Sequence, residues 1–184
     1  LPALEKAPDA LVLAMAAAAT SLETLFILPV ADVLRLNLES PAVVPLAAEG
    51  EMHLWTLNMK PGRPMVFGVV GGVPLLGLPG NPVAAMVNTL LFARPALRKM
   101  QGFSDLSLRT VTARLRRYER PRDARRHYVR VCLHQGPAGV EAVPTGDQGA
   151  GILNSLVQAD GLAVLPEGWD SQADGDVVAV ILLE

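Results

Sequence analysis

The hydrophobic pattern changes character about half-way along the chain. Two short apolar runs, Met65–Val70 and Val73–Leu78, flank Gly71-Gly72, which is the sequence signal of a two-residue hairpin. We therefore predict two antiparallel strands there. Beyond residue 105 the apolar runs stay short and are separated by polar turns, which is typical of an all-β unit.

A helix is predicted directly after the second of these strands. Asn81 suits the N-cap and Pro82 the first helical position, because a cap side chain accepts a free backbone N–H and proline has none to satisfy. Pro95 predicts a kink or a break, since it removes a backbone donor, and Gly102 predicts the end. The apolar positions recur at helical spacing: Val83, Met86, Val87, Leu90 and Leu97.

The second half predicts a small barrel or sandwich. Along Tyr128–Leu133, alternation places Tyr128, Arg130 and Cys132 on one face of a strand and the valines on the other. A short helix is predicted over Ile152–Gln158. The expected strands are Leu108–Leu115, Tyr128–Leu133, Leu162–Leu165 and Val177–Leu183, with a turn at Gln135–Gly139.

The first 50 residues have a less regular pattern. Ala10–Leu28 and Val30–Leu38 suit helices that prolines interrupt. The longest apolar run, Ala10–Ala19, is too short for a bilayer, which takes about 20 residues, and its upstream flank is not the positive flank of a signal peptide. With Cys132 as its single cysteine, the chain is predicted to be soluble and cytoplasmic, without a membrane segment. Residue 1 is Leu, so we expect the chain to start inside a longer natural product.

Composition supports a folded core and reveals a division of charge. The 184 residues are 51% hydrophobic and 18% charged, which excludes intrinsic disorder and a disulfide scaffold. Residues 94–130 hold 12 of the 16 basic residues, whereas residues 131–184 hold eight acids and no Lys or Arg. This shift predicts a unit boundary near Gly102–Asp105.

The chemistry that these patterns favour is anion binding. The strand, turn and helix start at Leu75–Val83 would present free N–H groups and a helix dipole at a sheet edge, which suits phosphate. Just upstream, a proline-rich turn places Lys60 and Arg63 where both could face the same oxyanion. An ordinary hairpin with a capped helix explains this pattern equally well. Gln148–Gly151 suits a second anion nest, although a plain loop fits it better.

A nucleic-acid interface is the alternative that the arginines suggest. A solvated loop explains them better, because only Tyr118 and Tyr128 could stack on bases and the C-terminal part is acidic. No metal-ligand spacing links the three histidines and Cys132. The arginines concerned are Arg114, Arg116, Arg117, Arg120, Arg122, Arg125 and Arg126.

Two motifs, Met59–Pro64 and Gly77–Val83, continued by Arg94–Gly102, resemble the molybdopterin molybdenumtransferase family, which includes bacterial MoeA and the E domain of gephyrin. Pro144–Gly149 and Ala159–Gly168 resemble the C-terminal β domain of that family. The resemblance covers roughly residues 49–184.

The resemblance implies a partial α/β molybdopterin-binding domain over residues 1–104, in which residues 1–48 have no assigned place, and a small all-β barrel over residues 105–184. It implies insertion of molybdate into adenylylated molybdopterin with Mg²⁺, by a homodimer of the full-length protein. It makes Lys60 the catalytic residue and assigns no metal ligand. The substrate contacts that it implies are Arg63, Pro79, Gly80, Asn81, Pro82 and Arg130.

The chain also departs from the family pattern. Thr56 and Ala150 stand where many members have Lys and Ser, and residues 10–48 contain no glycine, so the expected glycine-rich pterin motif is absent. We therefore expect the chain alone not to insert molybdenum. A non-catalytic pterin- or anion-binding relative, or a scaffold protein, is the alternative. Within the site, we expect Asn81 to cap its helix beside Lys60, and Arg130 to contact the ligand.

Overall fold

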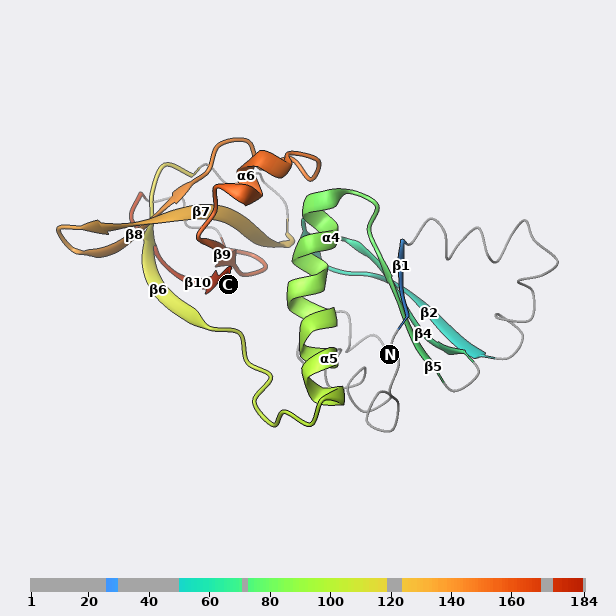
Figure 1. Cartoon of the computed structure of the whole chain (residues 1–184). Coiled ribbons are helices and arrows are strands. Elements are labelled where there is room, and N and C mark those ends of the chain that lie inside the picture. Colours follow the sequence, from blue (N-terminus) through green and yellow to red (C-terminus); the bar gives the residue numbers. More distant parts are fainter. Residues whose placement is uncertain (1–25, 30–49, 71–72, 119–123, 170–173, 184) are drawn as a thin grey trace. The chain divides into compact units, whose positions relative to one another are not determined.

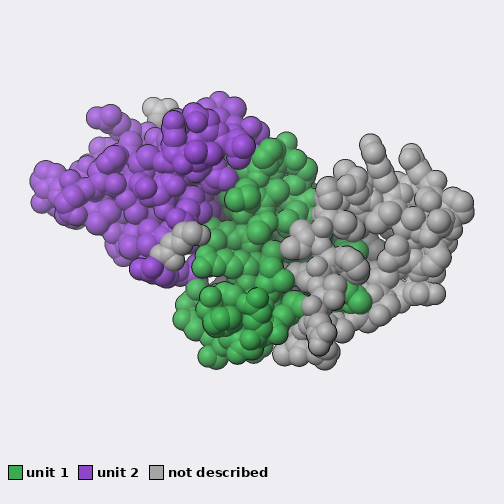
Figure 2. Space-filling view, viewed as in Figure 1, with its two compact units in different colours: residues 1–57, 62–107 green, residues 58–61, 108–184 purple. Residues whose placement is uncertain are grey.

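The computed structural model describes residues 26–29, 50–70, 73–118, 124–169 and 174–183 (Figure 1). Contacts divide the chain into two compact units, residues 1–57 with 62–107, and residues 58–61 with 108–184 (Figure 2). The short segment Asn58–Pro61 thus belongs to the C-terminal unit although it lies within the N-terminal part of the sequence. Within the described residues, no helix combines the length and apolarity needed to cross a bilayer.

The first unit contains a four-stranded sheet in the order β1-β5-β4-β2. β4 and β5 pair in antiparallel register, as their apolar runs predict, and the Gly71-Gly72 turn lies outside the described residues. β2 is antiparallel to β4, and β1 is parallel to β5. The strands are β1 (Phe26–Pro29), β2 (Gly50–Thr56), β4 (Pro64–Val70) and β5 (Val73–Leu78).

The helix predicted over Ala10–Leu28 is wrong at its C-terminal end. Phe26–Pro29 forms β1, whose backbone pairs with Leu75–Leu78 of β5. A short apolar run does not distinguish a helix from a buried strand, and here pairing with a distant strand decides. The rest of that prediction, together with Val30–Leu38, lies outside the described residues.

The predicted helix forms in three consecutive segments. α4 (Pro82–Asn88) begins with proline in its first turn, and a π-helical turn, Thr89–Ala93, leads into α5 (Arg94–Met100). Pro95 lies in the first turn of α5, where its missing N–H is tolerated, so the predicted break takes the form of the π turn before it. Buried side chains at i, i+4 spacing, including Val83, Val87 and Leu91, form its inner face.

The end of this helix lies where the sequence predicts it. Gly102 has a φ of 85°, a left-handed conformation that glycine adopts without steric cost. The Gly102 N–H donates to the Lys99 carbonyl at 2.9 Å, and the Phe103 N–H donates to the Arg98 carbonyl at 3.0 Å. These two bonds form a Schellman motif. The Arg98 guanidinium also lies 4.3 Å from the centre of the Phe103 ring.

The second unit is a closed five-stranded barrel, which is one of the two architectures, barrel or sandwich, that its strand pattern predicts. Its strands pair in the order β7-β8-β6-β10-β9, and β9 pairs with β7 to close the ring. β3 (Met59–Lys60) adds to β7 in parallel, and α6 (Leu153–Val157) follows the loop after β8. The barrel strands are β6 (Thr110–Leu115), β7 (Arg126–Gly136), β8 (Gly139–Pro144), β9 (Gly161–Leu165) and β10 (Val177–Leu182).

The interior of the barrel confirms the alternation predicted for β7. Val129 and Val131 belong to the apolar core, together with residues from all the other barrel strands, while Tyr128 and Arg130 are on the opposite face of the strand. Both of these outward residues are nevertheless buried, because other parts of the unit cover this face. The strand β8 was not predicted. It begins at Gly139, inside the predicted turn Gln135–Gly139, of which only Pro137-Ala138 forms the turn.

Candidate functional site

A cavity of about 380 Å³ lies in the C-terminal unit, beside the start of β7. Its lining includes one lysine, two tyrosines and one histidine, together with residues of a loop. The loop follows β8 and carries the Asp147–Gly149 segment. The lining residues are Lys60, Pro61, Tyr118, His127, Tyr128, Val129, Asp147, Gln148 and Gly149.

The parallel pairing of β3 with β7 places Lys60 at this cavity. In the register of the two strands Lys60 is the partner of His127, and the Arg126 N–H donates to the Asn58 carbonyl at 2.9 Å. His127 is only 2% exposed, and its Nδ1 lies 3.4 Å from the Tyr118 hydroxyl. An ammonium held beside aromatic side chains can attract an anion into a partly dry site.

The loop wall of the cavity is held by Arg130, which is fully buried. Its Nε donates to the Ser155 Oγ at 2.8 Å, and its Nη2 donates to the carbonyls of Asp147 and Gly149, both at 3.1 Å. Its Nη1 has no hydrogen-bond partner. Burial lowers the pKa of the Arg130 guanidinium from its ordinary value, and the nearby charge of Asp147 opposes this shift.

The other predicted site residues lie in the first unit. Arg63 is exposed, Pro79 is buried, and the exposed turn Gly80–Pro82 leads into α4. Contacts with a ligand at these positions stay predictions. The predicted pairing of this turn with Lys60, which belongs to the other unit, also stays a prediction.

The prediction that Asn81 caps its helix with its side chain is wrong. Asn81 occupies the N-cap position with an extended backbone, and its carbonyl accepts the first helical bond from the Ala85 N–H at 2.8 Å. Its exposed side chain makes no capping hydrogen bond. Proline at the next position already removes one free donor and holds φ near its helical value, so the helix begins without the cap.

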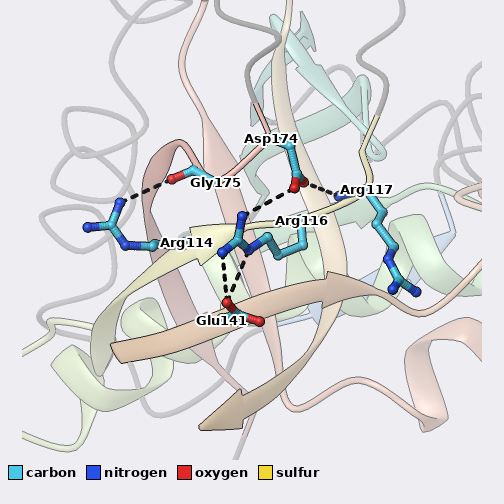
Figure 3. A network of polar contacts seen from close by, with 6 residues as sticks. All are labelled: Arg114, Arg116, Arg117, Glu141, Asp174 and Gly175. Carbon is cyan, nitrogen blue, oxygen red and sulfur yellow. Dashed lines mark hydrogen bonds and ion pairs between the residues drawn. The ribbon is translucent and has the colours of Figure 1, made fainter. Parts of the chain in front are cut away.

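Three arginines of the cluster, Arg114, Arg116 and Arg126, donate from their side chains within the barrel unit, and Figure 3 shows the first two. Arg116 donates to Glu141 from both Nε and Nη2, at 3.1 and 2.8 Å, and its Nη1 lies 3.2 Å from Asp174. The Asp174 carboxylate also accepts the Arg117 N–H at 2.8 Å. Arg126 pairs with Glu167 at 3.1 Å. Arg116 and Arg126 are thus paired with carboxylates and not freely solvated, whereas Arg120 and Arg122 lie outside the described residues. The choice between a solvated loop and a nucleic-acid interface stays a prediction.

Among the described residues, no group of three or more His, Cys, Asp or Glu side chains is arranged to hold a metal ion. The carboxylate that lines the cavity, Asp147, accepts the Gly149 N–H at 2.8 Å. The described residues thus contain no cluster of carboxylates of the kind that would hold the Mg²⁺ implied by the family resemblance.

Residues 112–183, which cover most of the barrel, match the family model described as the MoeA C-terminal region (domain IV). This part of the chain belongs to the MoeA C-terminal family. The match with MoeA extends over more of the chain in solved structures. The crystal structure of a molybdopterin biosynthesis MoeA protein from Pyrococcus horikoshii is 30% identical, with a TM-score of 0.60 over 78% of this chain and 34% of that one.

Two curated relatives match most of the chain. Gephyrin from Dictyostelium discoideum is 32% identical over 159 residues, and the molybdopterin molybdenumtransferase of Haemophilus influenzae is 27% identical over 140 residues. These alignments cover 73% and 71% of this chain, but only 22% and 33% of the two relatives. The chain thus spans a third or less of the length of these two relatives.

Of the nine residues that line the cavity, only Lys60 was predicted as a site residue. The eight others are Pro61, Tyr118, His127, Tyr128, Val129, Asp147, Gln148 and Gly149. The sequence held a weak signal for the last two, because Gln148–Gly151 suits an anion nest. For His127 there was no signal, since its place beside Lys60 depends on the pairing of β3 with β7.

Proposed function

We propose that this chain acts in molybdenum cofactor biosynthesis and contributes a binding site for the anions of molybdate insertion, adenylylated molybdopterin and molybdate. The observation that carries the proposal is the cavity beside β7, in which Lys60 faces the loop of the MoeA C-terminal segment. The cytoplasmic location and the homodimer implied by the family are parts of the same proposal.

Lys60 supplies the charge in this proposal. Its ammonium can donate three hydrogen bonds to an oxyanion, and the partly enclosed cavity strengthens them because little water competes. Tyr118 and Tyr128 line the same cavity, and phenol rings pack well against a planar heterocycle such as a pterin. Arg63 and the Pro79–Pro82 turn are proposed as further substrate contacts.

Titration of the whole chain with molybdate, and separately with adenylylated molybdopterin, tests the site by calorimetry. We expect Lys60→Gln to weaken binding about tenfold or more, since a hydrogen bond to a charged group contributes about 1.5–3 kcal/mol. Arg114→Gln is the matched control, because it removes the same charge from β6 outside the cavity. Absence of binding by the unaltered chain, or equal losses in both variants, would contradict the proposal.

The transfer step is tested separately. We expect the chain to bind adenylylated molybdopterin without converting it, because the glycine-rich motif expected of the family is absent from residues 10–48. Release of AMP with Mg²⁺ and molybdate present is the measurement. Robust turnover would contradict this expectation, whereas binding without turnover favours the alternative of a non-catalytic pterin-binding relative.

A further inference from the structure

The loop that forms one wall of the cavity is built around a single buried side chain. Arg130 and Gln148 bond to each other's polar groups: the Arg130 N–H donates to the Gln148 Oε1 at 2.9 Å, and the Gln148 Nε2 donates to the Arg130 carbonyl at 3.2 Å. The Arg130 guanidinium then reaches the carbonyls on either side of Gln148, those of Asp147 and Gly149. All three residues of this wall are therefore bonded to Arg130.

The same guanidinium ties the loop to α6. Its Nε donates to the Ser155 Oγ at 2.8 Å, and Ser155 in turn donates to the Ile152 carbonyl at 2.6 Å. The Thr145 Oγ1 donates to the Ser155 carbonyl at 2.7 Å, and the Thr145 N–H donates to the Arg130 carbonyl at 3.0 Å. Strand, loop and helix thus share one polar network with Arg130 at its centre.

We infer that Arg130 is a positioning residue, which sets the affinity of the cavity by holding the Asp147–Gly149 wall rather than by touching the ligand. The inference rests on the proposed function insofar as the cavity takes an anion. Arg130 is 0% exposed and does not line the cavity, whereas the three residues that it holds do. Its effect on the ligand passes through the loop backbone. The family resemblance implies a direct contact instead, and the experiment below distinguishes the two.

The geometry requires the planar fork of arginine. Nε and Nη2 point to acceptors on two different segments, the helix and the loop, and a guanidinium presents these donors in a fixed plane. A lysine at this position would keep the positive charge but offer one flexible ammonium. Charge and fork can therefore be separated by one substitution, Arg130→Lys.

The experiment measures two properties of the whole chain, the hydrogen exchange of the amides of Gly149 and Ile152, and the affinity for molybdate. These amides bond to Asp147 and to the Gly149 carbonyl, so they report the order of the wall. We expect Arg130→Lys to raise their exchange several-fold and to weaken molybdate binding about tenfold to a hundredfold, which is typical of losing a partner that orients a binding group. Arg114→Lys, the same change on β6, should alter neither.

Ser155→Ala is a second variant with no change of charge. It removes one acceptor of the guanidinium outside the cavity, so a positioning role predicts a smaller loss of affinity together with faster exchange. If Arg130→Lys does not fold, Ser155→Ala alone tests the positioning role of Arg130. The loss of affinity in Ser155→Ala should also be non-additive with the loss in Arg130→Lys, because the two residues act through one network.

Two results would overturn the inference. One is near-normal affinity in Arg130→Lys, which would mean that charge alone suffices. The other is lost affinity without a change in exchange of the wall, which would mean direct contact with the ligand. If the unaltered chain binds no molybdate, the proposed function fails, and the exchange measurement alone then decides whether Arg130 holds the wall.

Discussion

Gly161 lies where three strands of the barrel meet. It is paired with Val131 of β7 on one side and with Leu182 of β10 on the other. A Cβ at this position would lie 2.5 Å from the Val180 Cγ1 and 2.7 Å from the Ile181 carbonyl oxygen. The close approach of the backbone of β10 therefore requires a residue without a side chain.

We expect Gly161→Ala to lower the free energy of unfolding by about 1–3 kcal/mol, because the added methyl overpacks a closed barrel whose backbone cannot move aside freely. Urea unfolding measures the change. Gly151→Ala is the control: no atom lies within 4 Å of its Cβ position, so the effect should stay within about 0.5 kcal/mol. Equal effects in both variants would show that packing at Gly161 is not the cause.

Asn81 illustrates how a residue can occupy a capping position without capping. Its side chain makes no hydrogen bond to the first turn of α4. We therefore expect Asn81→Ala to change the free energy of unfolding by less than about 0.5 kcal/mol, below the typical 0.5–2 kcal/mol for a lost cap. Thermal or urea unfolding checks this, and a loss above 1 kcal/mol would contradict the observed geometry.

At the scale of elements, the segment Asp174–Gly175 before β10 is bonded to the C-terminal end of β6 and the residues after it (Figure 3). Asp174 accepts the Arg117 N–H and pairs with the Arg116 guanidinium, and the Gly175 N–H donates to the Leu115 carbonyl at 2.7 Å. The hydrogen bond from the Arg117 backbone and, secondarily, the charge of Arg116 lower the pKa of the Asp174 carboxyl from its ordinary value of 3.8.

This shift predicts a pH dependence. A carboxyl whose pKa is lowered by folding contributes stability above its unfolded pKa and loses that contribution as the pH falls through the folded value. We expect unaltered protein to be more stable than Asp174→Asn near neutral pH, with a difference that shrinks below pH 3.8 and then disappears. Urea midpoints at several pH values measure it. A difference that is independent of pH would contradict the ionic role of Asp174.

At the scale of the whole molecule, the short strand β3 joins a unit from which it is distant in sequence. Met59–Lys60 pairs with Arg126–His127, so the barrel unit includes a segment that precedes the whole helix α4–α5. The five strands of the closed ring, however, all lie within residues 108–184. The closed ring can therefore be separated from β3, which carries Lys60 of the cavity.

We expect a chain of residues 108–184 to fold, because the closed ring needs no strand from elsewhere, but to bind molybdate at least tenfold more weakly, because Lys60 is missing. Circular dichroism with cooperative urea unfolding checks the fold, and calorimetry checks binding. The full chain with Lys60→Gln is the control and should bind as weakly. Binding by residues 108–184 equal to that of the full chain would contradict the role of β3.

The sequence by itself determined the elements that depend on neighbouring residues. Alternation predicts which face of β7 enters the barrel, the Gly71-Gly72 signal predicts the antiparallel pairing of β4 with β5, and proline and glycine mark the helix over residues 82–100. These signals are local because backbone sterics and side-chain periodicity act over a few residues. Family motifs likewise predicted the relationship that residues 112–183 share with MoeA.

Only the tertiary structure decided which distant residues meet. Phe26–Pro29 is a strand because β5 offers it an edge, and Lys60 lies beside His127 because β3 pairs with β7. The burial of Arg130 was not predictable from the sequence either. Alternation places its side chain off the core face of β7, but the loop and α6 cover it completely. Burial and strand pairing are set by contacts between segments far apart in the chain, and the local pattern does not contain them.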